Sequence, residues 1–236
     1  MTDSLGDRMK SQYEDRFRVM LPRRTFTILR ADGKAFHTLT RGRRKPYDFD
    51  VVYGMDRVLL DLCQEVQGCA FGYVQSDEVS LLLADFQTIH TDAWFDGNLQ
   101  KMVSVAASVA TRAFNHAVDF TNMANRATFD CRAFTITDPV EVENYFIWRQ
   151  QDCTRNSVQS LAQAHFSPKE LHGVSNAKAQ DMLMTKGINW NDQPPGDKRG
   201  RVARHFTNTG WIIDQEPPVF TADRNYLIRE IPIRVD

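Results

Sequence analysis

Residues 69–83 read CAFGYVQSDEVSLLL, and this stretch decides the fold. The two apolar runs, 69–74 and 79–83, have the length and composition of β-strands. The four polar residues between them, Gln75 to Glu78, favour a tight hairpin connection. The sequence therefore predicts a β-hairpin with the acidic residues Asp77 and Glu78 at its tip.

The segments on either side of the hairpin complete the order of elements. Apolar residues recur three and four positions apart over 50–66 and over 98–118, which predicts a helix in each range. A strand beginning at Thr25 is expected to end at Asp32-Gly33, and another to span 129–136. The resulting order, βαββαβ, is that of the ferredoxin-like sheet, in which the first and third strands are central neighbours.

This strand order brings two carboxylates together. Asp32 lies at the exit of the first strand and Asp77 in the turn that enters the third, so antiparallel pairing places both at one edge of the sheet. Phosphoryl-type transfer needs a triphosphate held in line and its charge neutralised, usually by Mg²⁺ on carboxylates. We therefore predict the divalent-metal site of a nucleotidyltransferase at this edge.

Three neighbouring residues could complete such a site. Gly33 has no Cβ to obstruct approach, so its carbonyl oxygen could be a further hard ligand for Mg²⁺. Arg30 and Lys34 could neutralise phosphate oxygens. The alternative is a solvated strand end whose charges form surface ion pairs, as is usual for an isolated Asp-Gly. The second acidic position at the same edge favours the metal site.

The rest of the chain is expected to surround this sheet. Four-residue spacing of Leu5, Met9, Tyr13 and Phe17 predicts an amphipathic helix over 4–17. Further predictions are a helix over 140–164, one or two shorter helices over 167–185, a mobile basic loop over 187–204, and a final hairpin with arms 204–214 and 225–235. The fold class is α+β, with a palm over 1–138 and a C-terminal lobe over 139–236 that packs on the palm as one unit.

Composition limits the possible functions. The chain has 236 residues, a net charge of -1, 42% hydrophobic and 25% charged residues, as in an ordinary globular protein. This excludes a domain that binds nucleic acid through strong overall basicity. The first ten residues are polar, and no apolar run approaches the ~20 residues that span a bilayer, so we expect a cytoplasmic protein without membrane contact. The four cysteines lack metal-finger spacing and are interpreted as buried thiols.

Longer motifs resemble those of one family. They are RADGKAFH at 30–37, KPYD at 45–48, GYVQSDEVS at 72–80, WF at 94–95, FDCR at 129–132 and WRQQDC at 148–153, together with Lys101, Lys178 and Asn189. In these motifs the chain resembles the tRNA-His guanylyltransferase family, and the resemblance covers nearly the whole sequence. Members of this family add nucleotides to the 5′ end of tRNA, opposite to the ordinary polymerase direction, with a polymerase-like palm.

The resemblance implies a reaction and a set of catalytic residues. The family activates a 5′-monophosphate with ATP or GTP, after which the 3′-hydroxyl of an incoming nucleotide displaces the activating group. By resemblance, Asp32, Asp77 and the Gly33 carbonyl bind two Mg²⁺ ions, and Glu78 supports the acidic cluster and assists the attacking hydroxyl. GTP, ATP and other nucleoside triphosphates are the implied substrates, and tRNA is the implied partner, held by a homotetramer.

The resemblance also implies binding residues. Those for the nucleotide are Arg30, Asp32, Gly33, Lys34, Ala35, Phe36, His37, Lys45, Asp48, Ser76, Asp77 and Lys101. Those for tRNA or triphosphate are Arg149, Asn156, Lys178 and Asn189, and the basic stretch Lys198, Arg199 and Arg201 could grip RNA phosphates. The alternatives are core packing for Phe36, a structural hydrogen bond for His37, and solvated surface charge for the basic residues.

One departure from the family pattern bears on the substrate. After WRQQDC, eukaryotic guanylyltransferases carry His-Ile-Asn-Asn, whereas this chain reads Thr154-Arg155-Asn156-Ser157. The chain thus looks like the bacterial and archaeal relatives that repair truncated tRNA 5′ ends by templated addition. We therefore expect template-dependent 3′-to-5′ addition, with strict addition of G to tRNA-His as the alternative. More remote alternatives are a nucleotide cyclase, which shares a two-metal palm, and an RNA-binding module, which shares the βαββαβ order.

Overall fold

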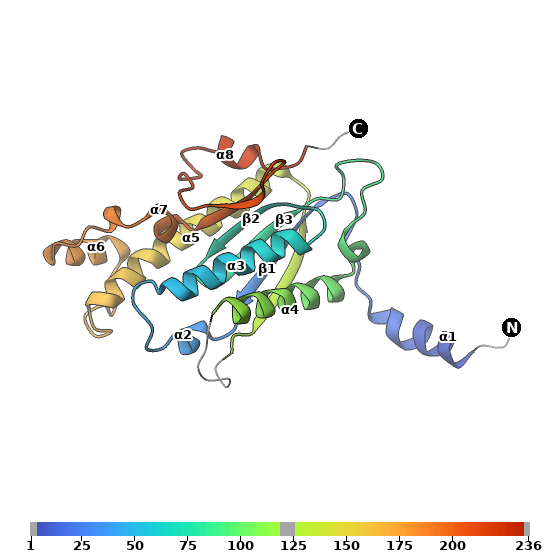
Figure 1. The fold of residues 1–236 in the computed structure, drawn as a ribbon, viewed down its shortest axis with the longest axis horizontal. Coiled ribbons are helices and arrows are strands. Elements are labelled where there is room, and N and C mark those ends of the chain that lie inside the picture. The colour runs from blue at the N-terminus through green and yellow to red at the C-terminus, as the bar shows by residue number, and fades with distance from the viewer. Residues whose placement is uncertain (1–3, 119–125, 234–236) are drawn as a thin grey trace.

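The computed structural model describes residues 4–118 and 126–233 (Figure 1). Six strands form one antiparallel sheet in the order β4-β1-β3-β2-β5-β6. The strands are β1 (Phe26–Gly33), β2 (Cys69–Gln75), β3 (Glu78–Leu83), β4 (Phe129–Ile136), β5 (Arg201–Phe206) and β6 (Gly210–Asp214). The first and third strands are neighbours, as the ferredoxin-like order predicted.

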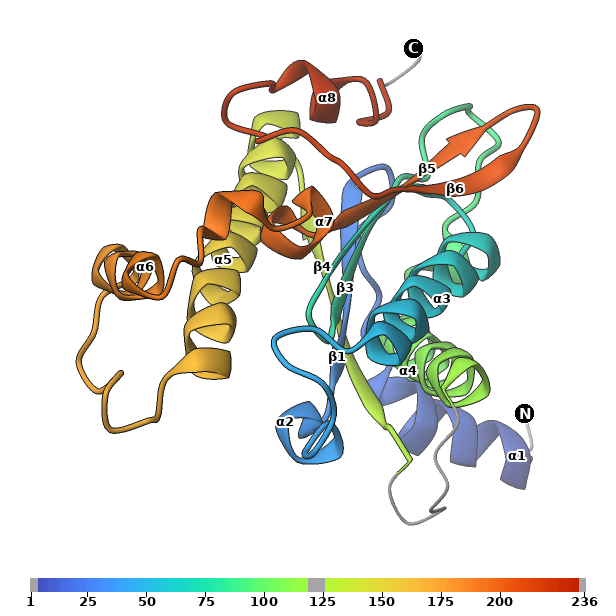
Figure 2. The ribbon, with the colours of Figure 1, turned by 60° about the vertical axis from the view of Figure 1, so that its left-hand side comes forward.

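Helices cover both faces of this sheet (Figure 2). Helices α3 (Phe49–Glu65) and α4 (Leu99–Ala117) pack on one face, and the long helix α5 (Pro139–His165) packs on the other. Side chains of β1 alternate between the two cores, because Leu29 belongs to the core under α3 and α4 and Ile28 to the core under α5. These three predicted helices are confirmed.

Shorter helices complete the structure. They are α1 (Leu5–Met9), η1 (Lys10–Glu14), η2 (Asp15–Phe17), α2 (Phe36–Leu39), η3 (Trp94–Gly97), α6 (Asn176–Thr185), η5 (Trp190–Asp192), α7 (Pro195–Arg199) and α8 (Asn225–Ile228). The predicted N-terminal helix is therefore confirmed as a continuous helical segment, and α6 is the only helix within 167–185. Among the described residues, none of the helices has the length and apolarity to cross a membrane.

The prediction of a mobile loop over 187–204 is wrong. This range forms η5, α7 and the start of β5. The Tyr73 hydroxyl donates to the Arg199 carbonyl at 2.7 Å. Gly200, at φ 78°, passes so close to Tyr73 that a Cβ would lie 2.5 Å from that hydroxyl oxygen. The polar, Gly- and Pro-rich composition favours a loop, but these long-range contacts fix the segment against β2.

The final hairpin also differs from the prediction. Its arms are β5 and β6, and β5 extends the sheet because Val202 pairs with Tyr73 of β2. The range predicted as the second arm begins with helix α8, which is anchored by the buried side chain of Leu227. Residues 234 and 235 of that predicted arm lie outside the described residues.

Candidate active site

The ends of β1 and β3 bring the two predicted metal ligands together. The Gly33 amide donates to the Asp77 carbonyl oxygen at 2.9 Å, so the strand end and the hairpin turn are directly bonded. Asp32 lies opposite Glu78 on β3 and opposite Asp130 on β4. Side chains of directly opposite residues share one face of a sheet, with Cβ atoms about 4.5–5.5 Å apart. The edge thus carries a row of three carboxylates, with Asp77 beside it.

Asp77 sits in an electrostatic environment that favours a bound cation. Burial raises the pKa of its carboxyl, the Ser76 hydroxyl opposes this shift by donating to it at 2.9 Å, and the neighbouring charges of Asp32 and Glu78 raise the pKa further. A divalent cation would relieve both the desolvation and the repulsion. The residues present therefore fit a metal ion.

The donor set at this edge is small. Within residues 4–118 and 126–233, no three His, Cys, Asp or Glu side chains are grouped as a complete protein metal site. Two carboxylates and a backbone carbonyl would leave the other positions to phosphate oxygens and water, which is the usual manner of Mg²⁺ binding beside a triphosphate.

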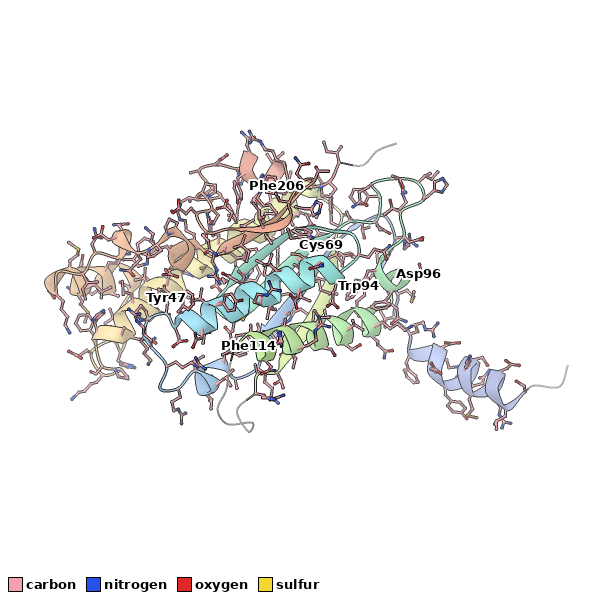
Figure 3. The ribbon with its side chains drawn as sticks, in the orientation of Figure 1. Tyr47, Cys69, Trp94, Asp96, Phe114 and Phe206 are labelled. Atoms are coloured by element: carbon pink, nitrogen blue, oxygen red, sulfur yellow. The ribbon has the colours of Figure 1, made fainter. Side chains whose placement is uncertain are left out.

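A cavity of about 460 Å³ opens next to the hairpin turn. Its size is that of a small-molecule site. The predicted site residues that line it are Gly33, Ala35, Phe36, His37, Lys45, Asp48, Ser76, Asp77, Asn156 and Arg201. The cavity lies at the end of the α3 and α4 layer where Figure 3 labels Tyr47. The structure thus gathers most of the predicted nucleotide-binding residues around one space.

Asp48 is held at the start of α3. Its carboxylate caps the helix by accepting the Val51 amide at 3.3 Å, and it also accepts the Arg44 amide at 3.1 Å and the Arg43 guanidinium at 3.2 Å. Burial alone would raise the pKa of Asp48, but these donors outweigh burial and hold the pKa below its usual range. Asp48 therefore presents an ionised carboxylate at the cavity wall.

Phe36 occupies the core, which is the alternative to base stacking. The residue is 5% exposed, and its ring makes edge contacts with Phe114 and Phe129 at centroid distances of 5.0 and 5.2 Å. Its neighbour His37 is exposed and borders the cavity. This burial favours core packing for Phe36, whose ring shapes the cavity wall by packing beneath Gly33.

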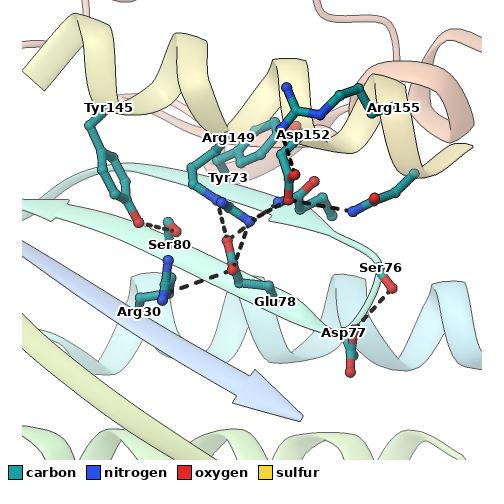
Figure 4. Close-up of polar contacts among 12 residues, drawn as sticks. Arg30, Tyr73, Ser76, Asp77, Glu78, Ser80, Tyr145, Arg149, Asp152 and Arg155 are labelled. Carbon is teal, nitrogen blue, oxygen red and sulfur yellow. Dashed lines mark hydrogen bonds and ion pairs between the residues drawn. The ribbon is translucent and has the colours of Figure 1, made fainter. Parts of the chain in front are cut away.

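Glu78 and Arg149 form a buried ion pair (Figure 4). Arg149 Nε and Nη2 donate to the two Glu78 oxygens at 2.8 and 2.9 Å. Arg30 lies on the same side, with Nε 3.7 Å from Glu78 Oε2. In the single chain Glu78 and Arg149 are thus paired with each other, and Arg30 lies beside them. The roles predicted for Glu78 at the attacking hydroxyl and for the two arginines at triphosphate or tRNA stay predictions.

Several other predicted residues lie away from the cavity. Lys101 is in the first turn of α4, next to η3, at the end of the layer where Figure 3 labels Trp94 and Asp96. Lys178 is in the first turn of α6, and Asn189 caps η5 by accepting the Asn191 amide at 3.0 Å. Within this one chain, the structure does not bring these three to the predicted metal site.

The basic stretch at 198–201 is not a continuous patch. Arg201 is 5% exposed and pairs with Asp56 of α3. The Lys198 ammonium donates to the Asn191 carbonyl and lies 5.4 Å from the centre of the Trp190 ring. Arg201 lines the cavity but is committed to a structural ion pair, so its predicted contact with RNA phosphates is not supported.

Sequence reasoning missed part of the cavity wall. Arg43 and Arg44, which precede the KPYD motif, line it, and so does Tyr47 within that motif. The run of positive charge before the motif was an available signal. Asp197 also lines it, and its carbonyl accepts the Tyr47 hydroxyl at 3.0 Å. No local pattern pointed to Asp197, because the sheet brings it there from 150 residues away.

The proteins that this chain resembles are consistent with a nucleotide site of this geometry. The sequence model of the tRNA-His guanylyltransferase family matches residues 6–137, which contain nearly all of the predicted palm and the candidate metal ligands Asp32, Gly33 and Asp77. This chain belongs to the tRNA-His guanylyltransferase family. Members of the family are nucleotidyltransferases, so the predicted enzyme class is confirmed.

Proteins similar to this chain in sequence or structure match it over most of its length. A solved bacterial tRNA(His) guanylyltransferase (Thg1)-like protein in complex with ATP is 43% identical, with a TM-score of 0.90, and the match covers 96% of this chain and 98% of that one. A second structure of that description, in complex with GTP, is 38% identical with a TM-score of 0.81, covering 97% and 99%. The tRNA(His) guanylyltransferase of Schizosaccharomyces pombe is 28% identical, covering 87% of this chain and 80% of the relative. The family resemblance therefore extends beyond the palm.

Proposed function

We propose that this protein adds nucleotides to the 5′ end of tRNA in the 3′-to-5′ direction, pairing each with a template base. The observation that carries this proposal is the hydrogen bond between the Gly33 amide and the Asp77 carbonyl. This bond joins the end of β1, where Asp32 lies, to the hairpin turn, where Asp77 lines the cavity. Family membership supports the activity, and the bacterial relatives in complex with ATP and GTP support these nucleotides as substrates.

In the proposed reaction the chain's own residues bind and orient the nucleotide. Asp32, Asp77 and the Gly33 carbonyl would hold Mg²⁺, which neutralises developing charge on phosphate oxygens when it is bound. Lys45 and Ser76 line the cavity and would bind phosphate oxygens. The same cavity would serve activation of the 5′ end and the following addition.

The cavity wall carries polar side chains that could hydrogen-bond to the edge of a nucleotide base. Asp48, held ionised at the start of α3, would accept hydrogen bonds from base N–H groups, and the neighbouring His37 is available to a ring or hydroxyl. Asn156 and Ser157, from the segment that departs from the eukaryotic pattern, line the wall formed by α5. This departure supports templated addition to several tRNAs over strict addition of G to tRNA-His.

The decisive test uses tRNAs that lack one or two defined 5′ nucleotides. Incubation with ATP, Mg²⁺ and single nucleoside triphosphates should extend each tRNA only with the nucleotide that pairs with the opposite base. Addition of G irrespective of the opposite base would favour strict guanylyl transfer. A cyclic product from GTP alone, without RNA extension, would refute the proposal in favour of a cyclase.

We also propose that copies of the chain associate, in line with the tetramer expected from the resemblance. The helical segment 5–17 has no buried residue and projects from the body (Figure 1). One face carries Leu5, Met9, Tyr13 and Phe17, which are 65%, 42%, 61% and 72% exposed. A short helix without packing is marginal in water, so a second copy covering this face would explain its formation.

Light scattering of the wild type and of Met9→Glu/Tyr13→Glu tests this association. We expect the wild type to have the mass of an oligomer and the double variant to have that of a smaller species. A monomeric wild type, or an unchanged mass for the variant, would contradict it.

A further inference from the structure

The Glu78 carboxylate is fixed between the sheet and helix α5 (Figure 4). Arg149 binds it with two bonds, at 2.8 and 2.9 Å, and the side chains of Arg149 and Glu78 are only 7% and 10% exposed. Paired contacts between a guanidinium and a carboxylate restrict both distance and orientation. The residue after Asp77 is therefore anchored to a helix that lies across the opposite face from α3 and α4.

Arg149 is also linked to the cavity wall through hydrogen bonds along α5. Arg149 Nη2 also donates to Asp152 Oδ2 at 3.0 Å. Asp152 in turn accepts Arg155 at 2.8 Å and the Asn156 amide at 3.4 Å, and Asn156 lines the cavity. One chain of polar contacts thus runs from the hairpin that carries Asp77 to the helix that forms the cavity wall.

Stability alone is a poor reason for this network. Desolvation of a buried ion pair offsets much of its attraction, and an apolar replacement is often as stable. The network also leaves two buried atoms, Arg30 Nε and Gln75 Oε1, without a hydrogen-bond partner among the described residues. The neighbouring part of the same sheet face is apolar, with Phe71 packed on Phe146. Buried ionic groups next to the ends of β1 and β3 therefore point to a role at the active site.

That role follows from the charges around Asp32. Glu78 lies directly opposite Asp32 and is covalently next to Asp77, so the three carboxylates repel one another. Arg149 neutralises Glu78 and draws it toward α5. This leaves Asp32 and Asp77 without a neighbouring Glu78 charge that is itself unpaired. Asp130, on the other side of Asp32, is exposed and lies 3.6 Å from Arg132.

We propose that Arg149 is a positioning residue for nucleotidyl transfer, which acts by holding Glu78 so that the turn presents Asp77 beside Asp32. This inference rests on the proposed function. Arg149 touches neither nucleotide nor metal in this role; Asp152 orients Arg149, and Glu78 is the group that Arg149 holds. The inference replaces the tRNA or triphosphate contact expected for Arg149.

The test compares Arg149→Met, Arg149→Lys and the double variant Arg149→Met/Glu78→Gln with a matched control. The control is Arg23→Met, because Arg23 pairs with the 9%-exposed Asp85 side chain at 2.7 Å, outside the cavity lining. Three quantities are measured: kcat and KM for tRNA per folded protein, Mn²⁺ affinity by electron paramagnetic resonance without nucleotide, and Tm.

We expect Arg149→Met to lower kcat about 100-fold, the scale of a 1 Å misplacement, with little change in KM for tRNA. Mn²⁺ affinity should fall about 10-fold, as when partners of metal ligands are removed. Arg149→Lys and the double variant should each recover part of both losses, because one retains the charge and the other leaves no unpaired carboxylate. Arg23→Met should lower Tm only.

Two outcomes would overturn the inference. One is wild-type kcat and Mn²⁺ affinity in Arg149→Met; the other is losses in Arg149→Met that equal those in Arg23→Met, which would indicate general destabilisation. A wild-type protein that binds Mn²⁺ but extends no tRNA would instead refute the proposed function. In that case the Mn²⁺ comparison would still decide whether Arg149 positions the carboxylates.

Discussion

Gly33→Ala should destabilise the protein by steric conflict at the centre of the active site. A Cβ at this position would overlap the Phe36 ring and lie 2.9 Å from its Cγ atom. The ring cannot withdraw, because Phe114 and Phe129 pack against it. Overpacking of a core costs about 1–3 kcal/mol. At about 2–4 °C per kcal/mol for a chain of this size, Tm should fall by roughly 2–12 °C.

Differential scanning calorimetry can separate this steric effect from a general one. The double variant Gly33→Ala/Phe36→Leu removes the ring that the new methyl group meets, so its loss of Tm should be smaller than the sum of the two single losses. Gly6→Ala is the control, because only the Ser4 hydroxyl oxygen lies near its new Cβ, at 3.9 Å. Additive losses, or an unchanged Tm in Gly33→Ala, would refute the packing argument.

Three further predictions concern charge and burial. Folding raises the pKa of Asp77, so ionisation of this carboxyl destabilises the folded state as pH rises through the range between the unfolded and folded pKa values. Asp77→Asn should therefore raise Tm at pH 7 without metal, while the rate of nucleotidyl transfer falls by several orders of magnitude. A lower Tm would contradict this. Arg201→Met should lower the free energy of unfolding in urea by about 3–5 kcal/mol, because it leaves the Asp56 carboxylate without its counter-charge. The salt dependence of tRNA binding should not change, and a shallower slope would support the predicted contact of Arg201 with RNA phosphates. Burial raises the pKa of Cys153 to about 12, so iodoacetamide at pH 8 should leave this thiol unmodified in the native protein, and rapid alkylation seen by mass spectrometry would contradict its burial.

The palm could be predicted because its signals are local. Apolar periodicity and strand composition marked Phe129–Ile136 with the bounds that the structure has, and the hairpin turn followed from four polar residues. The strand order then made Asp32 and Asp77 neighbours. A general rule about how such elements pair was sufficient for this step.

Long-range pairing explains what could not be predicted. Arg201 stands in a stretch whose composition is that of a mobile basic loop, yet its partner Asp56 lies 145 residues earlier in the chain. Glu78 and Arg149 are separated by 71 residues, and either charge alone is equally compatible with a solvated surface. Sequence patterns identify the residue types at a site, but the partner of each charge depends on packing between distant segments.

The most direct test of the account is extension of a 5′-monophosphorylated tRNA that lacks its first nucleotide. The wild type, with ATP, Mg²⁺ and the complementary nucleoside triphosphate, should give a product one nucleotide longer at the 5′ end, and Asp32→Asn and Asp77→Asn should each give none at the same protein concentration. A wild type that leaves the tRNA unextended, or an Asp77→Asn variant that extends it at the wild-type rate, would contradict the central claim that these two carboxylates form a nucleotidyl-transfer site.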